Sequence, residues 1–356
     1  MRKFDFLLIL LLLPFILISL FLVNEISHKL FIKELIYIGI GIAIFIVVYL
    51  IPIRKLLWII PIIYWINVFL LILVDLVGVK ILGAQRWLKI PGTNFTIQPS
   101  EFMKTTLLLM LGYLIYRYPP RPVYTFKEFL KLSFYIILPF LLIAKEPDLG
   151  TALILLIIGF GILFIVGVNK KIWITLVIGA VLFTPVAYKY LLKDYQKKRI
   201  ENFLTHPSYH VKQSLIAIGS GGLSGKNKEE ATQTQLKFLP IASSDFIFAY
   251  LVERFGFLGA LGIIFLYFLL IIHLLNTAEK LKEDYFAKVM FAGVGLMIFV
   301  YSYINIAMTM NLGPVVGVPL PLLSHGGTSF INFMILFAIL ENLISRKEFL
   351  NTYGVK

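Results

Sequence analysis

Ten long apolar runs, separated by short polar segments, decide what this chain can fold into. The chain has 356 residues, of which 59% are hydrophobic and only 15% are charged, whereas soluble domains are usually about half apolar. A run of about 17–25 apolar residues can cross a bilayer as a helix. The runs lie at 6–23, 35–53, 56–76, 99–116, 129–144, 149–168, 172–192, 246–275, 287–311 and 319–344. The sequence therefore predicts an all-α polytopic membrane protein with about ten transmembrane helices, in which residues 1–356 form one integral membrane domain.

The first run could be taken for a signal peptide, because it follows Met1-Arg2-Lys3. It is longer than the apolar stretch of about 7–15 residues that such peptides contain, and no small-x-small cleavage site follows it before Asn24. We therefore expect 6–23 to be the first membrane span.

Basic residues mark alternate connections between the runs. They are Arg2, Lys3, Arg54, Lys55, Arg117, Arg121, Lys127, Lys170, Lys171, Lys280, Lys282, Lys288, Arg346 and Lys347. Cytoplasmic loops carry an excess of Lys and Arg, so these segments and the N-terminus are expected inside. The large connection at about 193–244, between the seventh and eighth runs, is then extracytoplasmic. It is also basic, and an anionic ligand is the simplest reason for positive charge there.

The charge and the cysteine count restrict the function further. The net charge is +14, from 33 basic and 19 acidic residues, which in a membrane protein indicates anionic lipid or phosphate partners. Nucleic acid is not an expected partner, because the sequence contains no basic soluble domain. The absence of cysteine excludes disulfides, thiolate catalysis and cysteine-ligated metals.

Three acidic residues lie where a polar stretch gives way to an apolar run. They are Glu101 in QPSEFMK, Asp148 in EPDLGTA and Asp245 in SSDFIFA, and all three runs begin at the predicted outer face. Ionisable groups at a membrane boundary are costly and are functional candidates. An ordinary alternative is that all three cap helix starts. The two roles are compatible, since helix starts also offer N–H groups to a pyrophosphate.

Other charged residues permit two interpretations each. Glu253 follows Asp245 by eight residues, within one broad face of a helix. The alternative, which we favour, is that Glu253 and Arg254 form a structural ion pair within the membrane. Glu101 and Lys104 lie three residues apart on one helix face, so Lys104 either pairs with Glu101 or faces a phosphate. Arg86 adjoins Trp87, where interfacial anchoring by the tryptophan competes with phosphate contact by the arginine.

Two segments are rich in glycine, proline and polar residues. The first includes Lys212 and Gln213 and continues through Gly219–Lys226; glycines there would let the backbone approach a phosphate or sugar, unless the segment is a flexible linker. The second, residues 311–329, includes Ser324 and interrupts the last runs. Irregular backbone at membrane depth is tolerated only where it is buried or lines a cavity, so this segment predicts a cavity near the outer face.

Six motifs in one order together resemble the SEDS family (shape, elongation, division and sporulation) of the RodA/FtsW type, and RodA most closely. They are GAQRWLKI, QPSEFMK, EPDLGTA, SLIAIGSGGLSGK, FLPIASSDFIFA and GPVVGVPLPLLSHGGTS. The resemblance implies a peptidoglycan glycosyltransferase that polymerises lipid II during cell-wall elongation, together with a class B penicillin-binding protein. It also implies a place in the bacterial cytoplasmic (inner) membrane, with the active site facing outside.

The resemblance makes Asp245 the expected catalytic residue. The residues expected to contact the substrate are Glu101, Lys104, Asp148, Arg86, Lys212, Gln213, Ser244 and Ser324. A divalent cation, Mg²⁺ or Mn²⁺, is a further candidate, and no organic cofactor is expected. The chain departs from the family pattern, which commonly has Gln at Glu146, Glu at Ile241, Thr at Ser244, a second Glu at Arg254 and Tyr at His325.

In the favoured hypothesis, Asp245 removes the proton of the acceptor GlcNAc 4-hydroxyl, which attacks the donor MurNAc anomeric carbon with inversion. Arg86, Lys104 and Lys212 are candidates to hold the departing pyrophosphate. A lipid II flippase is one alternative, although clustering of the acids at one face argues against it. A non-catalytic scaffold of the cell-wall synthase is the other.

Overall fold

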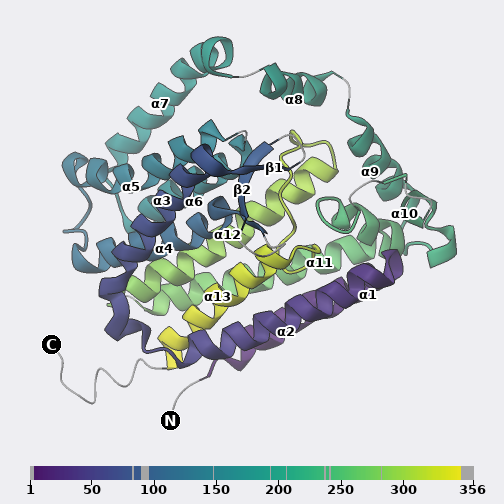
Figure 1. Ribbon diagram of the computed structural model, residues 1–356, viewed down its shortest axis with the longest axis horizontal. Coiled ribbons are helices and arrows are strands. Elements are labelled where there is room, and N and C mark those ends of the chain that lie inside the picture. The colour runs from purple at the N-terminus through teal and green to yellow at the C-terminus, as the bar shows by residue number, and fades with distance from the viewer. Residues whose placement is uncertain are drawn as a thin grey trace.

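The computed structural model describes residues 4–81, 84–89, 96–146, 148–192, 194–205, 207–235, 238–239, 242–281 and 283–345. Its long helices are α1 (Phe6–Ile26), α2 (His28–Leu50), α3 (Ile60–Val77), α4 (Pro99–Arg117), α5 (Phe126–Lys145), α6 (Leu149–Val166), α7 (Lys170–Val186), α11 (Ile247–Lys280), α12 (Tyr285–Thr309) and α13 (Gly327–Ser345). The prediction of an all-α polytopic membrane protein is confirmed (Figure 1).

Eight helical segments of the described chain are long and apolar enough to cross a membrane. The helices α4 and α5 are not among these eight; both carry charged residues within the helix. The predicted number of ten spans therefore stays a prediction, although both helices pack within the bundle.

Two predicted helix starts were wrong. The helix α2 begins at His28 rather than at 35, and α13 begins at Gly327 rather than at 319. Pro319 and Pro321 lack the N–H groups that a helix needs, and Leu322 has a left-handed backbone (φ 63°). The segment before α13 is consequently irregular. This agrees with the prediction that residues 311–329 interrupt the last apolar runs.

Short elements fill the two largest connections. Between α3 and α4 lies an antiparallel sheet of β1 (Val79–Ile81), β2 (Ala84–Lys89) and β3 (Thr96–Ile97), in that order. Gln85 fastens it to the end of α3 by donating from Nε2 to the Val74 and Asp75 carbonyls at 2.9 and 3.3 Å. The 193–244 connection contains α8 (Asp194–Leu204), α9 (Tyr209–Ser220), η3 (Lys228–Glu230) and α10 (Thr232–Gln235).

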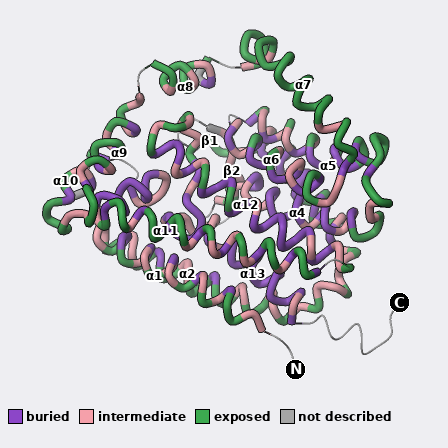
Figure 2. Tube along the Cα trace, turned by 180° about the vertical axis from the view of Figure 1, so that it is seen from behind, coloured by how far each residue is buried: buried purple, intermediate pink, exposed green. Residues whose placement is uncertain are grey.

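The core lies around α12, which is the most buried of the eight membrane-crossing candidates and packs on α11, α4 and α6. Small residues permit this close packing. A Cβ at Gly293 of α12 would lie 2.6 Å from Leu108 of α4, and one at Gly159 of α6 would lie 2.7 Å from Ile136 of α5. By contrast, no residue of α7 is buried, and α7 and α8 arch away from the bundle (Figures 1 and 2).

The glycine-rich segment after α9 packs against a break in α11. At Gly256 the helix has non-helical angles (φ 64°, ψ −163°), which free backbone groups on either side. Lys226 N donates to Glu253 O at 3.0 Å, while Phe257 N donates to Gly222 O at 2.9 Å. A Cβ at Gly225 would lie 2.2 Å from Arg254 O. The glycines therefore allow backbone to meet backbone within the protein, and neither earlier interpretation of this segment describes that role.

The expected ion pair between Glu253 and Arg254 was wrong. Arg254 donates from Nε and Nη2 to Glu25 at 2.7 and 2.8 Å, and the Tyr250 hydroxyl donates to the same carboxylate at 2.7 Å. Glu253 is fully buried and accepts from Gln233 N and the Thr234 hydroxyl, both at 3.0 Å. Neighbours on a helix point in different directions, so the two side chains serve different elements.

We predict that Arg254→Met destabilises the protein by about 3 kcal/mol, because breaking a buried pair leaves a desolvated charge. The Arg254 and Glu25 side chains are only 12% and 11% exposed. The matched control is Lys145→Met in the pair with Asp75, where the lysine is 70% exposed and the expected loss is below about 1 kcal/mol. Thermal unfolding in detergent measures both; equal losses would contradict the prediction.

Candidate active site

Asp245 lies in a turn before α11, not at the helix cap. The helix begins at Ile247, and its N-cap residue is Phe246. The capping alternative is therefore wrong for Asp245. The Ser244 hydroxyl donates a hydrogen bond to the Asp245 carboxylate, so the predicted substrate contact Ser244 also supports the predicted catalytic residue.

Three consecutive carbonyls of this turn are held by side chains or backbone from elsewhere in the chain. Ser243 O accepts from His325 N at 2.8 Å, and Ser244 O accepts from the Ser324 hydroxyl at 2.6 Å. Asp245 O accepts from Asn305 Nδ2 at 2.9 Å. Because buried carbonyls need partners, these bonds fix the turn and thereby the direction of the Asp245 side chain.

The residues that hold the turn are themselves held. Asn305 Nδ2 also donates to Val318 O at 2.7 Å, and the Ser324 hydroxyl accepts from Leu320 N at 2.8 Å. The His325 imidazole is hydrogen-bonded to Glu34 of α2, whose side chain is almost fully buried. Ser324 thus positions the turn, and its predicted contact with substrate stays a prediction.

The surroundings of Asp245 suit a base. Burial raises the pKa of the Asp245 carboxyl, and the hydrogen bond from Ser244 opposes that rise. A Cβ at Gly317, where φ is +75°, would lie 3.6 Å from Asp245 Oδ2. The loop backbone therefore passes close to the carboxylate, and the left-handed conformation explains the glycine.

Asp148 does cap a helix. It is the N-cap residue of α6 and accepts from Thr151 N at 3.2 Å. Its Oδ2 also lies 3.4 Å from Arg86 Nη1 and accepts from Gln98 Nε2 at 3.4 Å. The capping alternative is confirmed for Asp148. The same carboxylate also forms an ion pair with Arg86 of β2.

Glu101 and Lys104 form the predicted pair, with Lys104 Nζ 2.6 Å from Glu101 Oε1. The amine also donates to the Tyr301 hydroxyl of α12 and is only 2% exposed. In this conformation it is held within the bundle, and its contact with a phosphate stays a prediction.

The three acids gather at one end of the bundle. Tyr301 lies within electrostatic range of both Glu101 and Asp148, and Asn305, which holds the Asp245 turn, is four residues further along the same helix face. The loop connects them as well: Val316 packs on Gly150 at the start of α6, and the next residue, Gly317, lies against Asp245.

The helix α9 brings two further predicted residues to this end. Its Val211 and Ala217 share a buried cluster with Phe246 and Ala249, and the Ser214 hydroxyl donates to Thr309 O at 2.7 Å. Lys212 is exposed and Gln213 is half-buried. Both therefore lie on the helix that packs against the Asp245 turn. Within the described residues, no hydrogen bond or ion pair joins their side chains to the turn.

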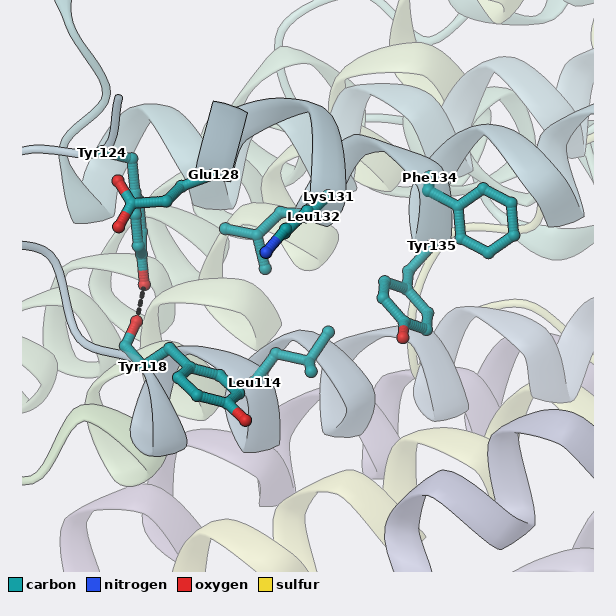
Figure 3. A pocket seen from close by; sticks show the side chains of 8 residues that line it. All are labelled: Leu114, Tyr118, Tyr124, Glu128, Lys131, Leu132, Phe134 and Tyr135. Atoms are coloured by element: carbon teal, nitrogen blue, oxygen red, sulfur yellow. Dashed lines mark hydrogen bonds between the residues drawn. The ribbon is translucent and has the colours of Figure 1, made fainter. Parts of the chain in front are cut away.

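Cavities occur at both ends of the bundle. A crevice of about 200 Å³ lies among α8, α9 and the loop from Asn311 to Val315, with Arg199 in its wall, next to the segment that reaches Asp245. A larger cavity of about 530 Å³ lies at the other ends of α4 and α5 (Figure 3). Its lining contains none of the predicted site residues, so its size does not make it the active site.

The described residues contain no group of three or more His, Asp or Glu side chains placed to hold a metal ion. Mg²⁺ is often bound by one or two carboxylates together with substrate phosphates. A divalent cation therefore stays a prediction.

The sequence interpretation missed several residues of this end. Asn305 and Tyr301 carry polar groups within an otherwise apolar run, which was an available signal. Glu34 was a second signal, as an acid at the edge of a predicted span. Their partners could not be inferred, because each contact joins segments far apart in the sequence.

Comparison with known proteins identifies the family. A model of the FtsW, RodA and SpoVE family of cell cycle proteins matches residues 3–348. The chain belongs to this family. Among curated relatives, the peptidoglycan glycosyltransferase MrdB of Helicobacter pylori strain J99 is 54% identical over 345 residues, covering 96% of this chain and 90% of the relative.

More distant members of the FtsW, RodA and SpoVE family extend the match. MrdB of Escherichia coli K12 is 38% identical over 320 residues, covering 88% of this chain and 85% of the relative. A probable peptidoglycan glycosyltransferase FtsW of Trichlorobacter lovleyi is 32% identical over 294 residues, covering 80% and 75%.

Solved structures confirm the fold of this family member. A chain from a study of the structural coordination of polymerization and crosslinking by a peptidoglycan synthase complex superposes with a TM-score of 0.84 at 23% identity, covering 97% of this chain and 99% of that one. The rod shape determining protein RodA of Thermus thermophilus gives 0.73 at 23% identity, with 97% coverage of both.

We predict that Asn305→Ala lowers activity by about 10²-fold, the cost of a displacement of about 1 Å in a reacting group. The matched control is Asn342→Ala, because Asn342 Nδ2 likewise donates to two backbone carbonyls, those of Tyr49 and Ile51, at 2.6 and 2.7 Å. Both variants should lose similar stability, since each substitution leaves two carbonyls without their hydrogen-bond donor. Polymerisation assays and thermal unfolding decide; equal activity of the two variants would refute the role given to Asn305.

Proposed function

We propose that this protein is a peptidoglycan glycosyltransferase that polymerises lipid II, with Asp245 as the general base. The observation that carries the proposal is the turn 243–245, whose three carbonyls are each hydrogen-bonded and which presents a carboxylate at the same end as Glu101 and Asp148. The names of the relatives as peptidoglycan glycosyltransferases support the reaction class.

In the proposed reaction the protein positions the two substrates, supplies a base and stabilises the charge of the leaving group. Asp245 takes the proton from the acceptor 4-hydroxyl as that oxygen bonds to the anomeric carbon of the donor. The bond from this carbon to the pyrophosphate oxygen breaks, its electron pair leaves with the pyrophosphate, and the configuration inverts. A base whose pKa is raised towards the working pH is well suited to proton removal, and burial raises the pKa of Asp245.

The leaving pyrophosphate needs positive charge. Lys212 is the exposed candidate, on α9. Arg86 lies on Asp148 and could hold a phosphate while keeping that pair, since a guanidinium offers five N–H donors. Lys104 would have to leave Glu101 and Tyr301, so we rank it third.

The proposal includes a location and a partner. The protein is a multi-pass membrane protein. We propose that the Asp245 end faces outside the cytoplasm, which the basic connections between the spans support. A class B penicillin-binding protein is the proposed partner. The similarity to a chain of a peptidoglycan synthase complex, which coordinates polymerization and crosslinking, supports this proposal.

Asp245→Asn is expected to reduce glycan-strand formation by about 10²–10⁴-fold, because the amide cannot accept the proton. The control is Asp284→Asn at the other end of α12. There Asn keeps the helix cap, and the lost pair with Arg54 reports what removing a carboxylate charge far from the site does. The assay uses purified protein with lipid II and the partner transpeptidase. Wild-type rates from a folded Asp245→Asn protein would refute the base, and lipid II translocation without polymer would favour a flippase.

Ser244→Ala is expected to shift the acid limb of the pH–rate profile to higher pH. Wild-type activity should rise as pH rises through the raised pKa of Asp245, because the base acts only when ionised. The Ser244 hydroxyl lowers that pKa, so its removal raises the pKa further. Ser244→Thr retains a hydroxyl and should keep the wild-type profile; an unshifted acid limb in Ser244→Ala would contradict the assignment.

A further inference from the structure

Glu146 is a buried acid that the proposed mechanism does not use. It follows the last residue of α5 and precedes Asp148 by two positions. Its side chain is 2% exposed, and neither carboxyl oxygen has a hydrogen-bond partner within the described residues. A buried ionised carboxylate without partners is very costly, so this position needs an explanation.

The charges around Glu146 leave it without a cation of its own. The groups that face it are Asp148 at the start of α6, Asp75 at the end of α3 and Arg86 of β2. Arg86 lies 3.4 Å from Asp148, and the preceding residue, Lys145, lies 2.7 Å from Asp75. Ionised Glu146 would make three carboxylates against these two cations.

The uncharged form of Glu146 is therefore favoured near neutral pH. Burial raises the pKa of Glu146 to about 8; the negative charges of Asp148 and Asp75 add to the rise, and Arg86 opposes it. A neutral Glu146 neither repels Asp148 nor competes with it for the guanidinium.

We propose that Glu146 is a positioning residue of the active site, which keeps Arg86 on Asp148 by remaining uncharged. The inference rests on the proposed function for its activity readout. When Glu146 ionises, Arg86 is drawn between two carboxylates and Asp148 is repelled from its place at the start of α6.

A path leads from this pair to the catalytic turn. Asp148 caps α6 through Thr151 N, and Gly150 in the same turn packs on Val316. The next loop residue, Gly317, lies against Asp245. A shift of Asp148 would therefore reach the loop backbone that borders the base.

The expected pH dependence follows from the sign of the shift. Activity that needs uncharged Glu146 is present below about pH 8 and falls by about tenfold for each pH unit above it. Stability changes over a different window. A carboxyl whose pKa is raised in the fold holds its proton in the folded state at pH values where the unfolded chain has lost it. The free energy of unfolding therefore falls as pH rises from about 4.5 to about 8, and above that range this contribution no longer changes.

The test compares wild type with Glu146→Gln, which is uncharged at every pH and nearly the same shape. Glycan-strand formation is measured between about pH 6 and pH 9.5, and the variant should keep its activity where wild type loses it. The matched control is Glu128→Gln at the other end of α5, where Glu128 completes a capping box that glutamine also supports. This control should lose activity at high pH as wild type does.

A second readout does not depend on activity. The melting temperature of wild type should fall relative to that of Glu146→Gln between about pH 5 and pH 8, and this difference should then level off. Glu146→Met, also long and uncharged, replaces the glutamine variant if that one does not fold. An alkaline loss of activity shared by wild type and the uncharged variant, or a melting-temperature difference that does not change with pH, overturns the proposal. If wild type makes no glycan strands at any pH, the proposed function fails, and the melting temperatures still test Glu146.

Discussion

The hydrogen bonds from Asn305 to the Asp245 and Val318 carbonyls are the interaction on which the site depends. Two segments meet there that would otherwise be loops without regular structure: the turn before α11 and the irregular chain before α13. One buried amide on the central helix satisfies a carbonyl of each. Since both loops lack secondary structure of their own, their geometry comes from such bonds to a rigid helix.

The same principle recurs around the site. Lys104 of α4 contacts Tyr301 of α12, and Glu34 of α2 contacts His325. The first contact joins two helices and the second joins a helix to the loop before α13. Both use polar groups with little access to water, where hydrogen bonds are strong and unpartnered groups are costly. These polar contacts hold the loops at this end of the bundle, so the candidate catalytic residue Asp245 can lie on a loop without losing its orientation.

The sequence was sufficient for the features that depend on local pattern. Apolar length located the ten long helices, and the junctions of polar and apolar sequence located Glu101, Asp148 and Asp245 at helix starts or just before one. The Glu101–Lys104 pair followed from helical spacing. Contacts between distant segments were not accessible in this way: Arg254 pairs with Glu25, 229 residues away, so the expected neighbour Glu253 was wrong. The small sheet was also missed, because its strands are two to six residues long.

The break at Gly256 has a consequence for depth in the bilayer. A continuous helix from Ile247 to Lys280 has 34 residues and would be about 51 Å long, well beyond a hydrocarbon core of about 30 Å. The backbone angles at Gly256 divide it into a first part of nine residues and a second part of 24 residues. The second part, at about 36 Å, is by itself long enough to span that core. A single glycine thereby separates the short helical segment that follows Asp245 from the portion of α11 that is long enough to cross the membrane.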